Sequence, residues 1–245
     1  NNLTVQELKV GGIRKSCYLC IMKIVFISDT HGKHEVLTSK AYNNILGEGD
    51  ILVHAGDCTN VGKSYEIKEF LDWFSNTPFK HKVFIAGNHD FGFEIVHDIA
   101  PEYKEMGVHY LFDRMVELDG VKIYGSPWQP EFYNWAFNLP RGKELAKKWS
   151  KIPEGLDILI THGPAYGMVD HTIQGLNVGC KDLFERVMIT QPKIHVCGHI
   201  HWAYGQKTFH GVEFLNASTL NERYQYENKP IVIEYNPETK EIDYV

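Results

Sequence analysis

The sequence predicts an α/β protein that folds as one domain. Six short apolar runs rich in β-branched residues recur along the chain, and each ends in a cluster of polar residues or glycine. Continuous apolar runs of this kind are typical of strands buried on both faces. Amphipathic segments lie between several of the runs, and no repeat, low-complexity segment or linker divides the chain. At 245 residues it is long enough for one large domain.

The predicted elements follow one another in a regular order. The buried strands are expected at residues 24–27, 51–53, 83–86, 121–124, 158–160 and 194–196. Residues 66–75 and 181–188 each gather their large apolar side chains on one face, which predicts two helices that cover a sheet. Near the end of the chain, residues 205–209, 212–215 and 231–235 predict antiparallel strands joined by turns.

The composition is that of a globular protein, with 43% hydrophobic and 23% charged residues. A net charge of −6 implies no general attraction to nucleic acid or to an anionic membrane. We therefore expect no membrane association, and the sequence carries no strong signal for nucleic-acid binding.

The cysteines and the N-terminus bear on the compartment. Five scattered cysteines indicate a reduced environment, and we expect a cytoplasmic protein. Cys17 and Cys20 form a lone C-x-x-C, either a metal pair or two small apolar residues leading into a strand. Residues 17–27 are too short to cross a bilayer, which takes about 20 residues, and no signal-peptide pattern is present. Residues 1–21 are expected to be an N-terminal extension or a cloning remnant.

Side chains that can bind metal follow five of the predicted strands. They are Asp29 and His31, Asp57, Asn88 with His89 and Asp90, His162, and His199 with His201. A glycine stands beside four of these groups, where the backbone must turn or approach closely. Because ligands bind at the carboxyl ends of strands in open α/β sheets, these side chains are expected in one pocket.

The residue types indicate a metal centre. Taken singly, Gly-Asp is a common turn, G-N-H-D fits a turn followed by a helix cap, and a lone histidine is usually a satisfied polar group. Together, carboxylate, amide and imidazole ligands suit Mn, Fe or Zn. Two cations roughly 3.5–4 Å apart need a bridging carboxylate with ligands on each side. The one-residue spacing in Asp29/His31 and in His199/His201 lets each pair face the same way.

The ordered set D-x-H, G-D, G-N-H-D, H-G and G-H-x-H resembles the signature of the calcineurin-like metallophosphoesterases, from Lys23 to Ser218. The resemblance implies a four-layer α-β-β-α sandwich, in which two mixed sheets pack face to face between helices. It also implies that residues 22–245 form a metallophosphoesterase domain that binds two divalent cations, Mn, Fe or Zn, with Mn favoured.

The resemblance implies a role for each motif residue. Asp29, His31 and His201 would hold the first metal, Asp57 would bridge, and Asn88, His162 and His199 would hold the second. His89 would lie over the metals as a catalytic residue that stabilises the phosphoryl charge or protonates the leaving oxygen. Asp90 would orient His89.

A narrower likeness points to the metallophosphoesterase-domain-containing branch, which is related to class III cyclic-nucleotide phosphodiesterases. It lies in S-P-W-Q-P at 126–130, F-N-L-P-R-G at 137–142 and N-A-S at 216–218. Some members of that branch have Gly at the first His of G-H-x-H, whereas His199 is present here. Asn60 replaces the Asp of protein phosphatases and the Tyr of purple acid phosphatases, which argues against both classes.

The expected reaction is hydrolysis of small phosphodiesters, with cyclic nucleotides as the suggested class, by attack of a metal-bound hydroxide. Residues 128–141 are dense in aromatics and predict either a loop packed on itself or a wall beside the metals. In the second case Trp128, Tyr133, Trp135 and Arg141 would contact a small-molecule phosphoester substrate. The alternatives are a phosphomonoesterase, a nuclease, or a catalytically silent scaffold, which typically loses metal ligands. The sequence leaves the oligomeric state open.

Overall fold

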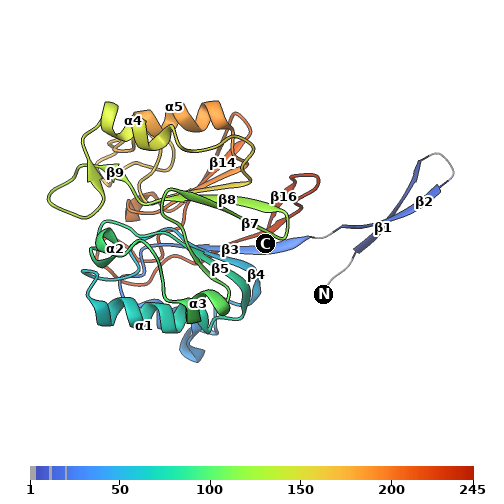
Figure 1. Cartoon of the computed structure of the whole chain (residues 1–245), viewed down its shortest axis with the longest axis horizontal. Helices are drawn as coiled ribbons and strands as arrows, with labels where there is room; N and C mark the ends of the chain where they lie inside the picture. The colour runs from blue at the N-terminus through green and yellow to red at the C-terminus, as the bar shows by residue number, and fades with distance from the viewer. Residues whose placement is uncertain (1–3, 11–12, 20) are drawn as a thin grey trace.

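The computed structural model describes residues 4–10, 13–19 and 21–245. The first two strands, β1 (Thr4–Val10) and β2 (Ile13–Leu19), pair with each other as an antiparallel hairpin. The predicted Cys17 and Cys20 pair falls outside the residues whose side chains are described. Two six-stranded sheets make up the centre of the molecule (Figure 1).

The first sheet has the strand order β16-β15-β3-β4-β5-β6. Its members are β3 (Met22–Ile27), β4 (Gly49–His54), β5 (Phe79–Phe84), β6 (Val108–Tyr110), β15 (Ile231–Tyr235) and β16 (Ile242–Tyr244). Strands β3 to β6 run parallel, whereas β15 is antiparallel to both β3 and β16.

The second sheet has the order β13-β14-β12-β11-β8-β7. Its members are β7 (Arg114–Leu118), β8 (Val121–Ser126), β11 (Ile158–Thr161), β12 (Ile194–Cys197), β13 (Gly205–Phe209) and β14 (Val212–Asn216). The four inner strands are parallel and the two edge strands are antiparallel to their neighbours. A small parallel pair, β9 (Gln129–Pro130) and β10 (Asn138–Leu139), stands apart from both sheets.

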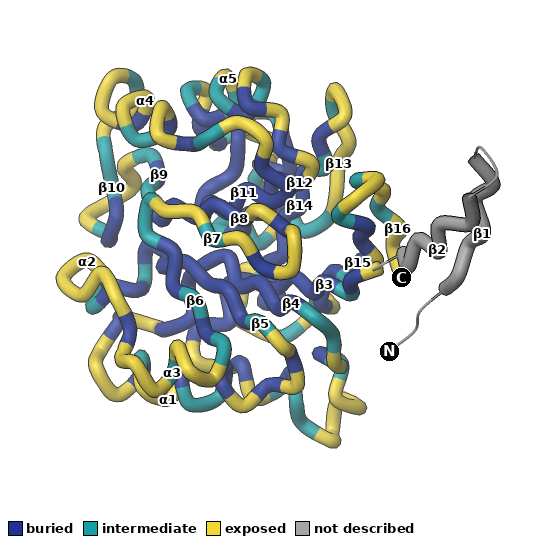
Figure 2. Tube along the Cα trace, turned by 45° about the vertical axis from the view of Figure 1, so that its right-hand side comes forward, coloured by how far each residue is buried: buried dark blue, intermediate teal, exposed yellow. Residues whose placement is uncertain are grey.

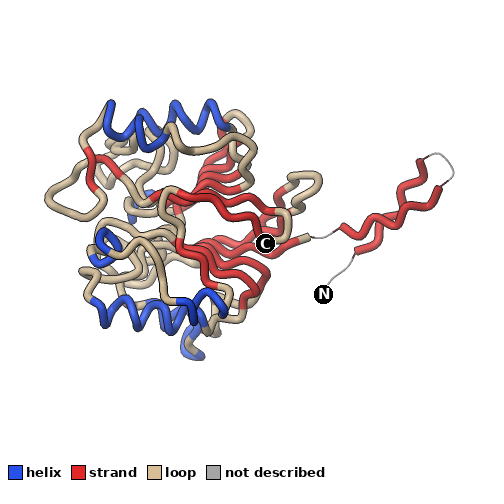
Figure 3. The backbone as a smooth tube through the Cα atoms, viewed as in Figure 1, coloured by secondary structure: helices blue, strands red, loops and turns tan. Residues whose placement is uncertain are grey.

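Helices cover the outer faces, so the molecule has the four layers that the family resemblance implied (Figure 3). The segments α1 (Ser64–Ser75), α2 (Gly92–Ile95) and α3 (Pro101–Glu105) lie on the side of the first sheet, and α4 (Lys143–Trp149) and α5 (Lys181–Thr190) cover the second. Three 3₁₀ helices complete the described elements: η1 (His34–Thr38), η2 (Lys40–Tyr42) and η3 (His201–Ala203). None of the helices in residues 21–245 is long and apolar enough to cross a membrane.

The inner strands are buried on both faces, which explains their continuous apolar sequence (Figure 2). In β3, Ile24 and Phe26 point into the core between the sheets, where Ile160 of β11 also packs. The alternate residue Val25 packs with Phe70 of α1 in the core beneath the helix. A third core joins α4 and α5 to the other face of the second sheet.

The structure corrects one part of the predicted topology. Residues 231–235 form β15, which does not join β13 and β14 in the second sheet but pairs with β3 in the first. Strand β14 pairs antiparallel with β13, as predicted, but its other neighbour β12 runs parallel to it. An apolar run shows that a strand is buried, and it does not show which neighbour the strand pairs with.

Candidate functional site

The five motif loops meet where the two sheets end. Strands β3, β4 and β5 deliver Asp29, His31, Asp57 and Asn88 from the first sheet, and β11 and β12 deliver His162, His199 and His201 from the second. Three overlapping trios lie close enough to hold a metal ion: Asp29–His31–His201, His31–Asp57–His89 and Asp57–His162–His199. In each trio the potential ligand atoms lie within 4.8 Å of one another. We call this set of residues, together with Asn88, the metal cluster.

Glycines in the motifs allow the cluster to close. A Cβ atom at Gly87 would lie 2.3 Å from an Asp57 carboxylate oxygen, and one at Gly198 would lie 2.0 Å from an Asp29 oxygen. Both distances are far below a van der Waals contact, so no side chain fits at either position. The backbone also turns sharply at the ligands, because Asp29, Asp57 and His199 all have positive φ angles of 54°, 56° and 67°.

Asp29 is fully buried and its carboxylate is held from two sides. The backbone N–H of His199 donates to both oxygens at 3.1 and 3.0 Å, and the Ser218 hydroxyl donates to Oδ2 at 2.9 Å. His201 Nε2 lies 3.5 Å from Oδ1. Asp29, from the first sheet, is therefore fixed by groups that belong to the loops of the second.

Asp57 occupies the middle of the cluster. Its Oδ1 accepts the backbone N–H of His89 at 2.8 Å. Its Oδ2 lies 3.7 Å from His31 Nε2 on one side and 3.2 Å from His162 Nε2 on the other. A single carboxylate oxygen thus faces ligands of both predicted metal positions.

The hydrogen bonds of the cluster leave ligand atoms free, which fits a bound metal. Both ring nitrogens of His31 are buried and have no hydrogen-bond partner among the described residues, an arrangement that is costly unless something else is bound there. His162 Nδ1 donates to the Ala55 carbonyl at 2.9 Å, and His201 Nδ1 donates to the Asn221 carbonyl at 3.1 Å. Each ring therefore presents Nε2 to the cluster, as ligating histidines do.

Asn88 and His199 complete the second group of predicted ligands. The amide oxygen of Asn88 lies 3.0 Å from His162 Nε2. The His199 ring lies with its centroid 5.1 Å from that of His162. The structure therefore brings together all seven residues that the sequence predicted as metal ligands.

The pKa values of the cluster follow from burial and charge. Burial lowers the pKa of His31 to about 4 and that of His199 to about 4. Burial acts the same way on His162 and His201, but the attraction of Asp57 and Asp29 outweighs it and raises both pKa values to about 9. Burial raises the pKa values of the two carboxylates, yet the surrounding histidines hold both well below the usual range. A divalent cation would displace the protons held between these pairs.

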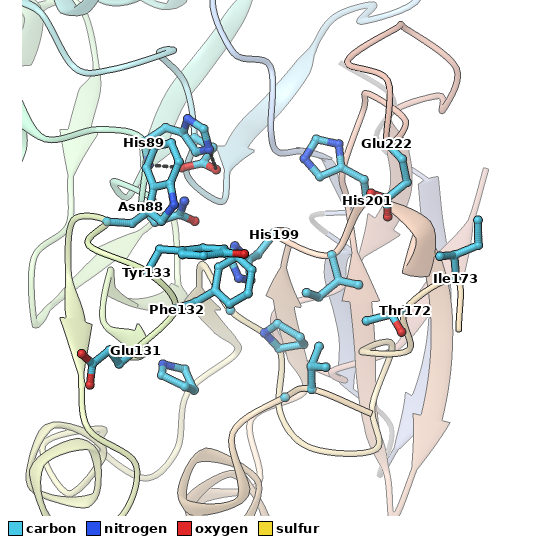
Figure 4. A pocket seen from close by; sticks show the side chains of 18 of the residues that line it. Asn88, His89, Glu131, Phe132, Tyr133, Thr172, Ile173, His199, His201 and Glu222 are labelled. Atoms are coloured by element: carbon cyan, nitrogen blue, oxygen red, sulfur yellow. Dashed lines mark hydrogen bonds and ion pairs between the residues drawn. The ribbon is translucent and has the colours of Figure 1, made fainter. Parts of the chain in front are cut away.

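His89 lies at the edge of the cluster and lines the adjoining cavity (Figure 4). Its Nδ1 lies 2.8 Å from the carbonyl oxygen of Asn60, which can only accept, so Nδ1 carries a proton. Its Nε2 lies 4.0 Å from Asp57 Oδ2. The Trp135 ring packs against the imidazole at a centroid distance of 4.1 Å.

The predicted orientation of His89 by Asp90 is not a direct contact, because the described hydrogen bonds of the Asp90 carboxylate do not include His89. The Asp90 carboxylate is fully buried and accepts the backbone N–H groups of Gly87, Cys58 and Thr59 at 2.8, 3.2 and 2.9 Å. It also accepts the Thr59 hydroxyl at 2.6 Å and the Cys58 thiol at 3.4 Å. Asp90 therefore ties two motif loops together, and the carbonyl that does orient His89 belongs to the residue after Thr59.

The four residues predicted to contact substrate divide into two groups. Tyr133, Trp135 and Arg141 line a cavity of about 710 Å³ beside the cluster. Trp128 does not, because its indole N–H donates to Asp113 at 3.1 Å and Lys148 lies 3.6 Å above its ring. Trp128 lines a separate open hollow with His97 and Phe112. The prediction that Trp128 contacts the substrate is therefore wrong.

Sequence reasoning missed several residues of the site. Tyr224 lines the cavity and packs its ring 4.7 Å from that of His31 and 5.4 Å from that of His201. No motif marks it, because it reaches the cluster from a turn that follows the last motif. In the sequence, Asn216 and Ser218 stand out only through the family likeness. Asn216 Nδ2 donates to the Ile200 carbonyl at 2.9 Å and so supports the loop that carries His199 and His201.

The fold and the cluster together define the class of metal-dependent phosphoesterases. The calcineurin-like phosphoesterase family matches residues 22–203, and the chain belongs to this family. It is 40% identical over 236 residues to the human metallophosphoesterase domain-containing protein 1, a match that covers 86% of this chain and 70% of the human protein. It is 35% identical to a UPF0046 protein of Caenorhabditis elegans, covering 90% of this chain and 62% of that one.

Solved structures share the fold at low sequence identity. The TT1561 protein of Thermus thermophilus superposes with a TM-score of 0.59 at 14% identity and covers 92% of this chain and 98% of its own. The phosphopantetheinyl hydrolase of Mycobacterium tuberculosis superposes with a TM-score of 0.51 at 17% identity, covering 82% and 90%. The protein is thus a hydrolase of the metallophosphoesterase type, whose family uses divalent metal ions.

Proposed function

We propose that the protein is a binuclear-metal phosphodiesterase that acts on small diesters, cyclic nucleotides among them. The observation that carries the proposal is the position of Asp57, whose Oδ2 lies between His31 and His162. One carboxylate oxygen that faces two sets of ligands is the arrangement that two neighbouring cations require.

The roles of the ligands follow from the same geometry. Asp29, His31 and His201 would hold one cation, Asn88, His162 and His199 would hold the other, and Asp57 would contact both. The oxygen and imidazole donors suit Mn, Fe or Zn, and we favour Mn. When bound, the cations would activate water and neutralise charge on the phosphoryl oxygens.

His89 would act on the substrate and not as a ligand. Its Nδ1 proton is committed to the Asn60 carbonyl, so Nε2 is the atom that faces the cavity. In the imidazolium form this nitrogen can donate to a phosphoryl oxygen or to the leaving oxygen. Trp135 covers one face of the ring and Tyr224 lies 6.4 Å away, so the imidazole is held in place and partly shielded from water.

The test joins metal analysis to a panel of substrates. We expect about two equivalents of metal and faster turnover of bis-(p-nitrophenyl) phosphate and cyclic nucleotides than of p-nitrophenyl phosphate. Asp57→Asn should lose both activity and metal, because it weakens ligation on both sides. Faster hydrolysis of the monoester would indicate a phosphomonoesterase, and faster hydrolysis of single-stranded DNA would indicate a nuclease. Metal binding without any turnover would favour a scaffold.

A further inference from the structure

The cavity beside the metal cluster is larger than a phosphoryl group needs. Asp57, His89, His199 and His201 form one end of it, and the rest of its 710 Å³ lies between residues 130–141 and residues 172–179. Cavities of this size hold whole drug-sized ligands. If the phosphorus binds at the cluster, as the proposed function requires, the remaining space receives a group that is esterified to it.

One wall of this space is aromatic, and its backbone is held by hydrogen bonds. Phe132 and Tyr133 belong to the loop between β9 and β10, and their rings pack edge to face with centroids 4.5 Å apart. They are 56% and 75% exposed, yet the Asn138 amide donates to their carbonyls at 3.1 and 2.8 Å. Figure 4 shows both rings pointing toward the side of the cavity where His199 lies. The backbone that carries these rings is therefore held in place, and both rings add apolar surface to the cavity.

The opposite wall carries apolar Ile173 between polar Thr172 and Gln174, and the guanidinium beside it is already engaged. Ile173 is 58% exposed and lines the cavity from the loop between β11 and α5. Arg141 donates to the carbonyls of Gly179 and Val178 at 2.8 and 2.7 Å, so it fastens this loop. Asp170 fastens it from the other side by accepting the Gly179 N–H at 2.9 Å. Arg141 is thus an anchor of the wall more than a partner for a ligand anion.

Apart from Arg141 and the residues of the metal cluster, the charged residues that line the cavity are acidic. Glu131 and Glu222 line it, and no lysine does so among residues 21–245. Glu222 accepts the Trp202 backbone N–H at 3.2 Å and lies beside His201 in Figure 4. A second negative charge on the ligand would meet these carboxylates, which is unfavourable at short range.

From these walls we infer the substrate class. We propose that the cavity selects phosphodiesters whose ester arm presents an apolar or aromatic face and carries no negative charge. A phosphate or carboxylate on that arm is rejected. This inference rests on the proposed function, because it places the phosphorus at the cluster.

Three phosphonates with a single arm test the inference by binding to the manganese-loaded protein. Methylphosphonate, phenylphosphonate and 4-carboxyphenylphosphonate share the metal-binding group and differ only in the arm. We expect phenylphosphonate to bind at least roughly 10-fold more tightly than methylphosphonate, because the ring buries several more carbons. The added carboxylate should cancel most of that gain. Titration calorimetry measures all three constants without any need for turnover.

Three test variants and two control variants assign the effect to the residues that line the cavity. Phe132→Ala and Tyr133→Ala should each lower the preference for phenyl over methyl by roughly 3–10-fold and leave methylphosphonate binding unchanged. Tyr65→Ala, an exposed tyrosine on α1, is the matched control. Glu222→Lys should restore binding of the carboxyphenyl ligand, and Glu234→Lys on β15 should not.

The outcomes separate the two proposals. Equal binding of the methyl and phenyl ligands, or equal binding of the phenyl and carboxyphenyl ligands, overturns the inference on the ester arm. An equal loss for all ligands in Phe132→Ala does the same, because it would show a general disturbance of the site. Failure to hydrolyse any phosphodiester, with the binding preferences intact, overturns the proposed function and leaves the arm selectivity standing.

Discussion

At the scale of single residues, the hydrogen-bond partner of a histidine decides what it can do. His162 and His201 each give their Nδ1 proton to a backbone carbonyl and turn Nε2 toward a carboxylate. His89 is held in the same way by Asn60, but it stands 14% exposed at the cavity. We therefore propose that the same side chain serves as a ligand in the interior of the cluster and as a proton donor at its edge.

This division predicts the behaviour of His89→Ala. Loss of one positioned donor typically lowers the rate by roughly 10²–10³-fold, so kcat should fall by that factor. Metal content should stay at the wild-type level, because His89 lies outside the proposed ligand set. His97→Ala removes an exposed histidine whose ring bonds to the Glu94 carbonyl, and it serves as the control. A loss of metal in His89→Ala would show that the trio His31–Asp57–His89 is a true ligand set.

Histidines outside the cluster predict how stability depends on pH. Burial lowers the pKa of His34 to about 4, and it lowers those of His54 and His195 to about 3. In the unfolded chain these groups take up a proton near pH 6.5, whereas the folded protein resists it. The free energy of unfolding should therefore fall as pH drops from 6.5 toward 4, and it should be insensitive to these groups above pH 7.

The variant His34→Phe isolates one such contribution. His34 packs between Phe70 and Trp73, with ring centroids 5.7 and 4.7 Å away, so a phenyl ring suits the site. Between pH 6.5 and 4 its removal should reduce the slope of stability against pH by up to about 1.4 kcal/mol per pH unit. Urea unfolding at several pH values measures the slope. His171→Phe, at an exposed position, should leave it unchanged, and an unchanged slope in both variants would refute the explanation.

At the scale of elements, buried carboxylates hold the motif loops together. Asp90 gathers donors from two loops, and Glu66 at the start of α1 accepts the backbone N–H groups of Asn60, Val61 and Lys63 at 3.3, 3.3 and 2.9 Å. Between them they fix residues 58–63, which include the carbonyl that orients His89. Asp90 and Glu66, which do not line the cavity, thus determine the geometry of His89, which does.

The variant Asp90→Asn tests this indirect role. An amide has one acceptor oxygen and would turn its own N–H₂ toward backbone N–H donors, so several bonds must be lost. We expect the free energy of unfolding to fall by about 1–3 kcal/mol and kcat to fall with it, while metal content is retained. Asp243→Asn, at an exposed position of β16, should change stability by less than about 0.5 kcal/mol. Full activity in Asp90→Asn would mean that the loop holds His89 without help from the carboxylate.

The elements also show what the sequence could and could not predict. The strands and the grouping of the motif residues were predictable because β3, β4, β5, β11 and β12 are buried on both faces where they run into the motifs. The place of β15 was not, because an apolar run is compatible with either sheet. The role of Trp128 was not predictable either, because nothing in the sequence distinguishes it from the other aromatic residues of its loop. Only the fold brings Asp113 and Lys148 to its ring. Tyr224 reaches the cluster through a turn that no local pattern marks.

At the scale of the whole molecule, the metal cluster joins the two sheets. Asp29, Asp57 and Asn88 come from loops of the first sheet, and His162, His199 and His201 from loops of the second. Direct bonds already cross this boundary, such as the one from the His199 N–H to Asp29. A cation bound by both sets of ligands would connect the halves of the fold at the edge where the apolar core between them ends.

Metal loading should therefore stabilise the entire protein and not one loop. A ligand that binds only the folded state at 100 times its dissociation constant adds about 2.7 kcal/mol. For a chain of this size each kcal/mol raises Tm by about 2–4 °C, so manganese should raise Tm by roughly 5–10 °C and a chelator should reverse the change. Asp57→Asn should lose most of the shift, because it faces both sets of ligands, whereas Asp243→Asn on β16 should keep it. Calorimetric scans with Mn, Fe and Zn, together with metal analysis, measure the effect. Binding of only one equivalent of metal, or a Tm that does not change with any of the three metals, would contradict a binuclear centre shared by the two sheets.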